Sequence, residues 1–154
     1  MSIRHMLPQD VLRIHAANEY GELAEVALGV IKRMESDQIG MVCGPITTGG
    51  LGDHRVNLWN FNAAIETLLV NGYPIFNQTP FEVTLARLER ASGNGYDDRI
   101  LTEFYAPIFE SGHITHQYFM HNWRSSRGAL WEHESAQKRG TAIVYLDENH
   151  LPVL

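Results

Sequence analysis

The 154-residue chain has a single cysteine, Cys43, and few basic residues. One thiol cannot form an intramolecular disulfide, which is typical of proteins that work in a reducing cytoplasm. The 12 Lys and Arg residues against 18 Asp and Glu give a formal net charge of −6. This charge argues against a nucleic-acid polymer as partner, because binding to such a polymer requires a basic surface.

Long apolar runs are also missing. No segment approaches the roughly 20 apolar residues that a membrane-spanning helix requires. Met1–His5 is not followed by the apolar core of a signal peptide. The sequence therefore predicts a cytoplasmic protein without membrane contact. Its 44% hydrophobic and 19% charged residues are ordinary for a folded chain, and the length fits one structural unit.

Amphipathic helices alternate with short apolar strands along the chain. Helical spacing of apolar residues predicts helices over 10–34, 53–71, 80–89, 97–110 and 128–139. Short apolar runs predict strands over 39–43, 73–76, 117–121 and 141–146. Strands joined by helices imply crossover connections, and hence a parallel sheet with helices on both faces. The expected fold class is therefore α/β, with three layers and a four- to five-stranded parallel sheet.

The N-terminal helix stands apart from this pattern. We expect residues 1–36 to form a helical extension and residues 37–154 to form the α/β domain. The apolar stripe from Leu12 to Met34 is long for a domain of this size. It predicts self-association into a homo-oligomer, a dimer or larger.

Three loops follow the predicted strands, at 44–52, 77–81 and 122–132. Ligands of parallel sheets bind beyond the carboxyl ends of the strands. Glycines let a ligand approach the backbone amides, and a following helix N-terminus favours an anion. Tight turns without a ligand are the alternative. The candidate substrate-binding residues in these loops are Gly44, Pro45, Ile46, Thr47, Thr48, Gly49, Gly50, Asn77, Gln78, Phe81, Asn122, Ser126 and Gly128.

Glu132 is the candidate catalytic residue. It lies near the start of the helix over 128–139, where the positive end of the helix dipole favours an ionised carboxylate. Such a carboxylate can attack an anomeric carbon or stabilise the positive charge that develops there. An ordinary first-turn acid or capping residue is the alternative. Glu134 is two positions away, so only one of the two can face a given site.

No cofactor or metal is expected from the remaining residues. A zinc site built on His113, His116 and His121 would require all three to converge, whereas His113 precedes the predicted strand that carries His121. Cys43, inside an apolar run, is interpreted as a small buried hydrophobic residue. Trp123 and Trp131 could stack on a base, but packing is the preferred interpretation.

Two segments together resemble the nucleoside 2-deoxyribosyltransferase superfamily. One is Met41-Val-Cys-Gly-Pro-Ile-Thr-Thr-Gly-Gly50, followed by an amphipathic helix and Gly72-Tyr-Pro-Ile-Phe76. The other is Ser126-Arg-Gly-Ala-Leu-Trp-Glu-His-Glu-Ser-Ala136, followed by Gly140 and an apolar strand. Matching Gly128 and Ala136 to the superfamily's loop glycine and helix alanine places Glu132, rather than Glu134, at the nucleophile.

The resemblance covers residues 41–146 and implies a flavodoxin-like or Rossmann-like fold. It also implies an oligomer whose site is completed by a neighbouring subunit, and chemistry at an N-glycosidic bond. Ser126 falls where nucleotide hydrolases of the superfamily carry a serine near the 5′-phosphate, which favours a nucleotide. The superfamily's aspartate before the third strand is absent here, and Asp97, Asp98 or Glu110 could replace it.

Two functions follow for this chain. One is cleavage or transfer at the N-glycosidic bond of a (deoxy)nucleoside 5′-monophosphate or nucleoside, with Glu132 as the nucleophile. The other is a non-catalytic module that binds or senses a nucleotide in the same pocket, which the missing aspartate favours. A third alternative, a flavodoxin-like carrier of FMN, would use the Thr47–Gly50 segment for the phosphate.

Overall fold

The computed structural model describes residues 5–93 and 95–153, and the chain divides into two compact units. The first unit consists of Asp37–Asn77 and Ile114–Leu154, and the second of Ser2–Ser36 and Gln78–His113. Residues 78–113, which the sequence analysis placed with the α/β domain, therefore group with the N-terminal helices. No helix in the described ranges is long and apolar enough to cross a bilayer.

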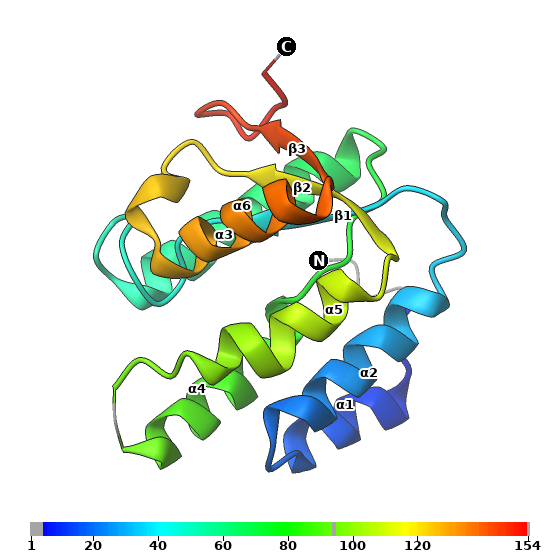
Figure 1. Cartoon of the computed structure of the whole chain (residues 1–154), viewed down its shortest axis with the longest axis vertical. Coiled ribbons are helices and arrows are strands. Elements are labelled where there is room, and N and C mark those ends of the chain that lie inside the picture. The colour runs from blue at the N-terminus through cyan, green and yellow to red at the C-terminus, as the bar shows by residue number, and fades with distance from the viewer. Residues whose placement is uncertain (1–4, 94, 154) are drawn as a thin grey trace. The chain divides into compact units, whose positions relative to one another are not determined.

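The first unit is a parallel sheet with a helix on each face (Figure 1). Its strands lie in the order β1-β2-β3, and Cys43 pairs with Phe119, which pairs with Tyr145. Its elements are β1 (Ile39–Cys43), α3 (His54–Val70), β2 (Ile114–Phe119), the short helix η3 (Trp123–Ser125), α6 (Arg127–Arg139) and β3 (Ala142–Tyr145).

Alternation along the strands separates the two faces of this sheet. Val42 and Tyr118 belong to the core on the α3 side, together with Ile65 of that helix. Cys43 and Phe119 belong to a second cluster that includes Ala129 of α6. Because successive residues of a strand point to opposite faces, α3 and α6 cover opposite faces of the sheet. The first unit therefore has the three layers of the predicted α/β class.

The prediction of four to five strands is wrong for the described chain, which has three. The segment 73–76 makes only one isolated parallel bridge, between Ile75 and Gly40. The Gly40 amide donates to the Pro74 carbonyl at 2.8 Å, and the Phe76 amide donates to the Gly40 carbonyl at 2.9 Å. Pro74 has no amide hydrogen, so it cannot contribute a donor to a longer ladder. β2 also begins three residues before the predicted start at Gln117.

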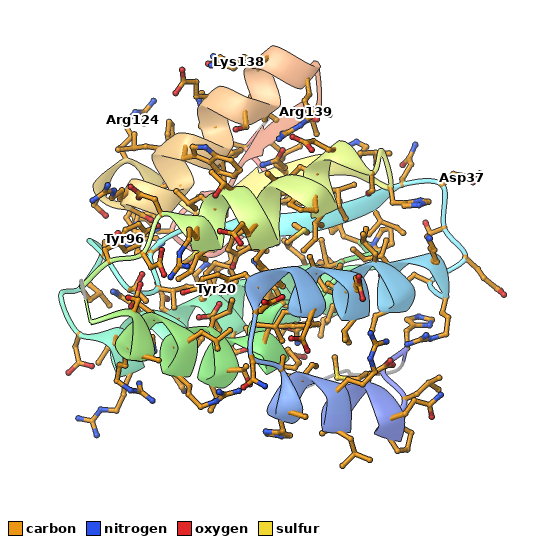
Figure 2. The ribbon with its side chains drawn as sticks, turned by 60° about the horizontal axis from the view of Figure 1, so that its bottom comes forward. Tyr20, Asp37, Tyr96, Arg124, Lys138 and Arg139 are labelled. Atoms are coloured by element: carbon orange, nitrogen blue, oxygen red, sulfur yellow. The ribbon has the colours of Figure 1, made fainter. Side chains whose placement is uncertain are left out.

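The second unit is helical in its described residues. It contains α1 (Pro8–Ala16), α2 (Tyr20–Lys32), the short helix η1 (Thr79–Phe81), α4 (Glu82–Ser92), the π-helical segment η2 (Ile100–Tyr105) and α5 (Ala106–Glu110). Tyr20 lies at the start of α2 (Figure 2), and its hydroxyl donates to Asp97 at 2.9 Å. Ile100, Phe104 and Ile108 are buried, as their spacing predicted.

The single helix predicted over 10–34 is in fact two helices. The first of them begins earlier than residue 10, since Leu7 is the N-cap of α1, and Asp10 accepts a hydrogen bond from the Leu7 amide. Ala17 ends α1 in an extended conformation, with φ −64° and ψ 140°. Arg87 of α4 donates to the carbonyls of His15 and Ala17, which satisfies acceptors left open where the helix stops.

The apolar stripe of these two helices is used unevenly. Leu23, Ala27 and Ile31 of α2 are buried, whereas Leu12 of α1 is 71% exposed. The α2 part of the stripe therefore belongs to the core. Self-association remains a prediction, for which α1 offers exposed apolar residues.

The helix predicted over 97–110 is interrupted by its π-helical segment. Pro107 lies just beyond that segment, at the start of α5. A proline has no amide hydrogen, and its ring clashes with the carbonyl four residues earlier, here that of Glu103. A wider turn before Pro107 relieves this clash, and proline is a common cause of such irregular turns.

Candidate functional site

Glu132 lies on the face of α6 that packs against the sheet. The buried residues of α6 are Ala129, Glu132 and Ala136, which share one side of a helix because they are three and seven positions apart. Glu134 points elsewhere, with its side chain 66% exposed and paired with Lys138 at 3.2 Å. Of the two glutamates, only Glu132 is directed inward, so the two do not face the same side of the helix, as their two-residue spacing predicted.

Two side chains from the sheet contact Glu132, one at its carboxylate and one at its backbone. The Cys43 thiol donates to Oε2 of Glu132 at 3.2 Å. Nε2 of Gln117 lies 3.5 Å from the Cys43 sulfur and 3.5 Å from the Glu132 carbonyl oxygen. Glu132 is only 6% exposed, and Cys43 and Gln117 are fully buried. A carboxylate, a thiol and a carboxamide thus form one interior polar cluster.

This environment keeps the thiol protonated. Burial, reinforced by the neighbouring charge of Glu132, raises the pKa of the Cys43 thiol well above its usual value. The thiolate is the nucleophilic form of cysteine, so Cys43 is not an attacking group here. The thiol instead acts as a hydrogen-bond donor to the carboxylate.

The glycine-rich loop adopts one defined conformation, held by Asn57 of α3. The side-chain Nδ2 of Asn57 donates to the carbonyls of Ile46 and Gly49 at 3.3 and 3.0 Å. The side-chain Oδ1 of the same residue accepts from the Leu51 amide at 2.8 Å. Gly49 and Gly50 have φ values of 68° and 61°. Only glycine adopts this left-handed region without strain, so both glycines are required by the backbone of the loop.

The same loop is bonded to the segment that begins α6. The Gly50 amide donates to the Ser125 hydroxyl at 2.7 Å, and the Arg127 amide donates to the Thr48 hydroxyl at 3.0 Å. The loops at 44–52 and 122–132 are therefore brought together, as expected for loops at the same edge of a parallel sheet. Because the Gly50 and Arg127 amides are already bonded within the protein, they are less available to a ligand.

The other predicted residues of this edge have distinct positions. Ser126 is the N-cap of α6 and accepts a hydrogen bond from the Ala129 amide at 3.2 Å, so capping is the role that the structure shows. Gly128 lies in the first turn of α6. Asn122 precedes η3, and its buried Oδ1 atom has no hydrogen-bond partner among the described residues. Gly44, Pro45 and Ile46 are buried in the loop that follows β1.

The loop at 77–81 contains the point where the chain passes from the first unit to the second. Asn77 is the last residue of its segment in the first unit, and Gln78 begins a segment of the second. Phe81 is fully buried in the second unit, and its ring centroid lies 5.4 Å from that of Phe104. Phe81 is thus a core residue of the helical unit.

An aromatic stack packs between α6 and the strands β2 and β3. The Trp123 and His133 rings stack at 4.2 Å, and Nε2 of His133 lies 2.7 Å from the Tyr145 hydroxyl. The Arg124 guanidinium lies 4.5 Å from the centre of the Trp123 ring, just before α6 (Figure 2). Burial and the Arg124 charge lower the pKa of His133. Trp123 therefore packs within the protein, which is the interpretation that the sequence analysis preferred.

The described residues contain no group of three or more His, Cys, Asp and Glu side chains that could hold a metal ion. The three histidines considered for zinc have other surroundings. For example, Nδ1 of His116 lies 2.8 Å from the Thr115 hydroxyl, and its ring stacks on Tyr118.

Comparison with family models, with curated proteins and with solved structures found no match in any of the three. The geometry of the site is therefore what bears on the function of this chain.

Three residues of this site were not assigned to it from the sequence, and Cys43 was interpreted only as a buried hydrophobic residue. Asn57, which braces the glycine-rich loop, could have been found as a polar residue one turn before Phe61 on the apolar face of α3. Gln117 and Cys43 lie on neighbouring strands, and both face α6. The contact between their side chains depends on the register of β1 and β2, which local sequence patterns do not give.

Proposed function

We propose that this protein cleaves or transfers at the N-glycosidic bond of a nucleoside 5′-monophosphate or nucleoside, with Glu132 as the nucleophile. The observation that supports this most is the position of Glu132. Its carboxylate is buried and held by the Cys43 thiol, on the helix whose N-terminus is bonded to the glycine-rich loop. A carboxylate on the helix that begins at a candidate ligand loop suits nucleophilic glycosidic chemistry.

The proposed reaction has two steps. An oxygen of Glu132 forms a bond to the anomeric carbon as the bond between that carbon and the base nitrogen breaks. The nitrogen leaves with the bonding electron pair and takes up a proton from solvent. Water then attacks the anomeric carbon in hydrolysis, or a second base does so in transfer; the attacking group releases a proton to solvent, and the bond between Glu132 and the sugar breaks with its electron pair returning to the carboxylate.

Groups for the sugar and phosphate lie at the same edge of the sheet. Within the described residues, the Thr47, Thr48 and Gly49 amides make no hydrogen bond to the protein, which leaves them available to an anion. The buried acceptor Oδ1 of Asn122 suits a donor such as a sugar hydroxyl.

Base release from a panel of nucleosides and nucleoside 5′-monophosphates tests this proposal. Glu132→Gln keeps the size of the side chain and removes its charge, so we expect base release to fall by at least about 1000-fold. Glu134→Gln is the matched control, because Glu134 is exposed on the same helix, and it should retain wild-type activity. Equal activity in the wild type and Glu132→Gln would contradict the proposed role of Glu132.

The non-catalytic binding module remains the second candidate. It is favoured by the internal hydrogen bonds of the glycine-rich loop, which shape a fixed site without supplying an acid for the leaving base. Thermal unfolding with nucleoside monophosphates separates the two functions, because a ligand raises the melting temperature whether or not it reacts. Stabilisation without release of base from any compound of the panel would favour the binding module.

A further inference from the structure

The cluster around Glu132 contains polar groups that packing alone does not explain. Cys43 and Gln117 are fully buried between the sheet and α6, where apolar side chains of similar size would fill the same space. Oε1 of Gln117 has no hydrogen-bond partner among the described residues, and a buried acceptor without a partner lowers stability. A carboxamide at this position therefore requires another explanation.

We propose that Cys43 and Gln117 are positioning residues for the Glu132 carboxylate. This inference rests on the proposed function, in which Glu132 attacks the substrate. The thiol binds one carboxylate oxygen, Oε2, at 3.2 Å. Gln117 contacts both the Cys43 sulfur and the backbone of α6 at Glu132, so it ties the donor and the helix to the same strand.

The physical role of these contacts is to fix the rotation of the carboxylate. The last torsion of a glutamate side chain is broad, so a carboxylate without partners samples many orientations. A donor on Oε2 restricts that rotation and defines the direction in which the other oxygen faces. Attack on a carbon requires such alignment, and small misplacements reduce the rate strongly. The thiol is suited to this task because it stays protonated and does not compete as a nucleophile.

The single cysteine makes the thiol–carboxylate contact directly observable. The folded protein has one S–H stretching band in the infrared, and a strong acceptor moves that band to lower frequency. A carboxylate is a stronger acceptor than a carboxamide, so Glu132→Gln should move the band to higher frequency. A band at the same frequency in both proteins would show that the thiol does not bind this carboxylate.

Kinetics of two Cys43 variants separate positioning from packing. Cys43→Ser retains a donor and should keep kcat within a few-fold of the wild type. Cys43→Ala lacks the donor and should lower kcat by about 10- to 100-fold with KM unchanged. A role in packing alone predicts the opposite order, because alanine is the less polar residue in a buried site. Melting temperatures of both variants show that each is folded.

The outcomes distinguish this inference from the proposed function. Wild-type kcat in Cys43→Ala, with Glu132→Gln inactive, would overturn the positioning role and leave the proposed function standing. If the wild type itself releases no base, the proposed function fails. The infrared band then still decides for or against the bond between the thiol and the carboxylate.

Discussion

At the scale of single residues, the glycines of the loop after β1 differ in what surrounds them. A Cβ atom added at Gly49 would overlap the carbonyl oxygen of Ser125, whereas one added at Gly52 would meet nothing within 4 Å. Both residues have positive φ, 68° and 78°. Strain of the backbone is thus common to both positions, and contact with the segment before α6 is specific to Gly49.

This difference predicts unequal effects of two alanine substitutions. Gly52→Ala should lower the free energy of unfolding by about 1 kcal/mol, the usual effect of a side chain in the left-handed region. Gly49→Ala should lower it by more than about 2 kcal/mol, because the loop must also move away from Ser125. Urea denaturation measures both values. Equal losses would mean that the loop does not pack against Ser125 as described.

At the scale of helices and strands, those bounded by capping residues or formed by apolar runs were predictable from the sequence. Asp53 begins α3, and its carboxylate accepts from the amides of Arg55 and Val56. Gly140 ends α6 with φ 71°. The strands β1 and β3 stand out as short apolar runs between such signals. Capping residues and apolar runs act over a few positions, so sequence patterns locate them.

The predicted element boundaries were wrong where contacts between residues distant in sequence decide the structure. The end of α1 at Ala17 is satisfied by Arg87, 70 residues away, and no glycine or proline marks it. The start of β2 was missed because Thr115 and His116, which face opposite sides of the sheet, are both polar. In the candidate site, helical spacing predicted only that Glu132 and Glu134 could not both face one site, and the choice of Glu132 came from the resemblance. The contact of Glu132 with Cys43 depended on tertiary packing.

The N-terminus of α6 tests whether Ser126 serves the helix, the ligand or both. Ser126→Ala removes the side-chain cap and should lower the free energy of unfolding by about 1 kcal/mol. Ser126→Asp keeps a capping oxygen and should restore most of that loss. Its negative charge should nevertheless raise KM for nucleoside monophosphates more than KM for nucleosides, since only the former carry a phosphate.

Chemical denaturation and steady-state kinetics with both substrate classes measure these effects. Gly128, in the same turn, is left unchanged in both variants. An equal change of KM for the two substrate classes would indicate that Ser126 is a helix cap only, and that the phosphate lies elsewhere.

At the scale of the whole molecule, the stability of the fold depends on carboxyl groups buried in its interior. Glu82, in the first turn of α4, is 6% exposed. Its burial raises its pKa from 4.5 to about 7, against the opposing effect of a hydrogen bond with Tyr105. Asp97 behaves in the opposite way, because its hydrogen bonds to Arg99 lower its pKa to about 2. These two groups therefore affect stability in separate pH ranges.

Because of the raised pKa of Glu82, we expect the free energy of unfolding to fall as pH rises toward neutral. The folded protein binds the Glu82 proton more tightly than the unfolded chain, so the contribution of this group is complete below pH 4.5 and is lost as pH rises to about 7. A shift of this size corresponds to about 3 kcal/mol in the free energy of unfolding. Glu82→Gln is neutral at every pH and should remove this decline, so the variant gains on the wild type as pH rises. Glu103→Gln, an exposed change in the same unit, should follow the wild-type curve. Parallel wild-type and Glu82→Gln curves between pH 4.5 and 8 would show that Glu82 is ionised in the folded protein throughout that range.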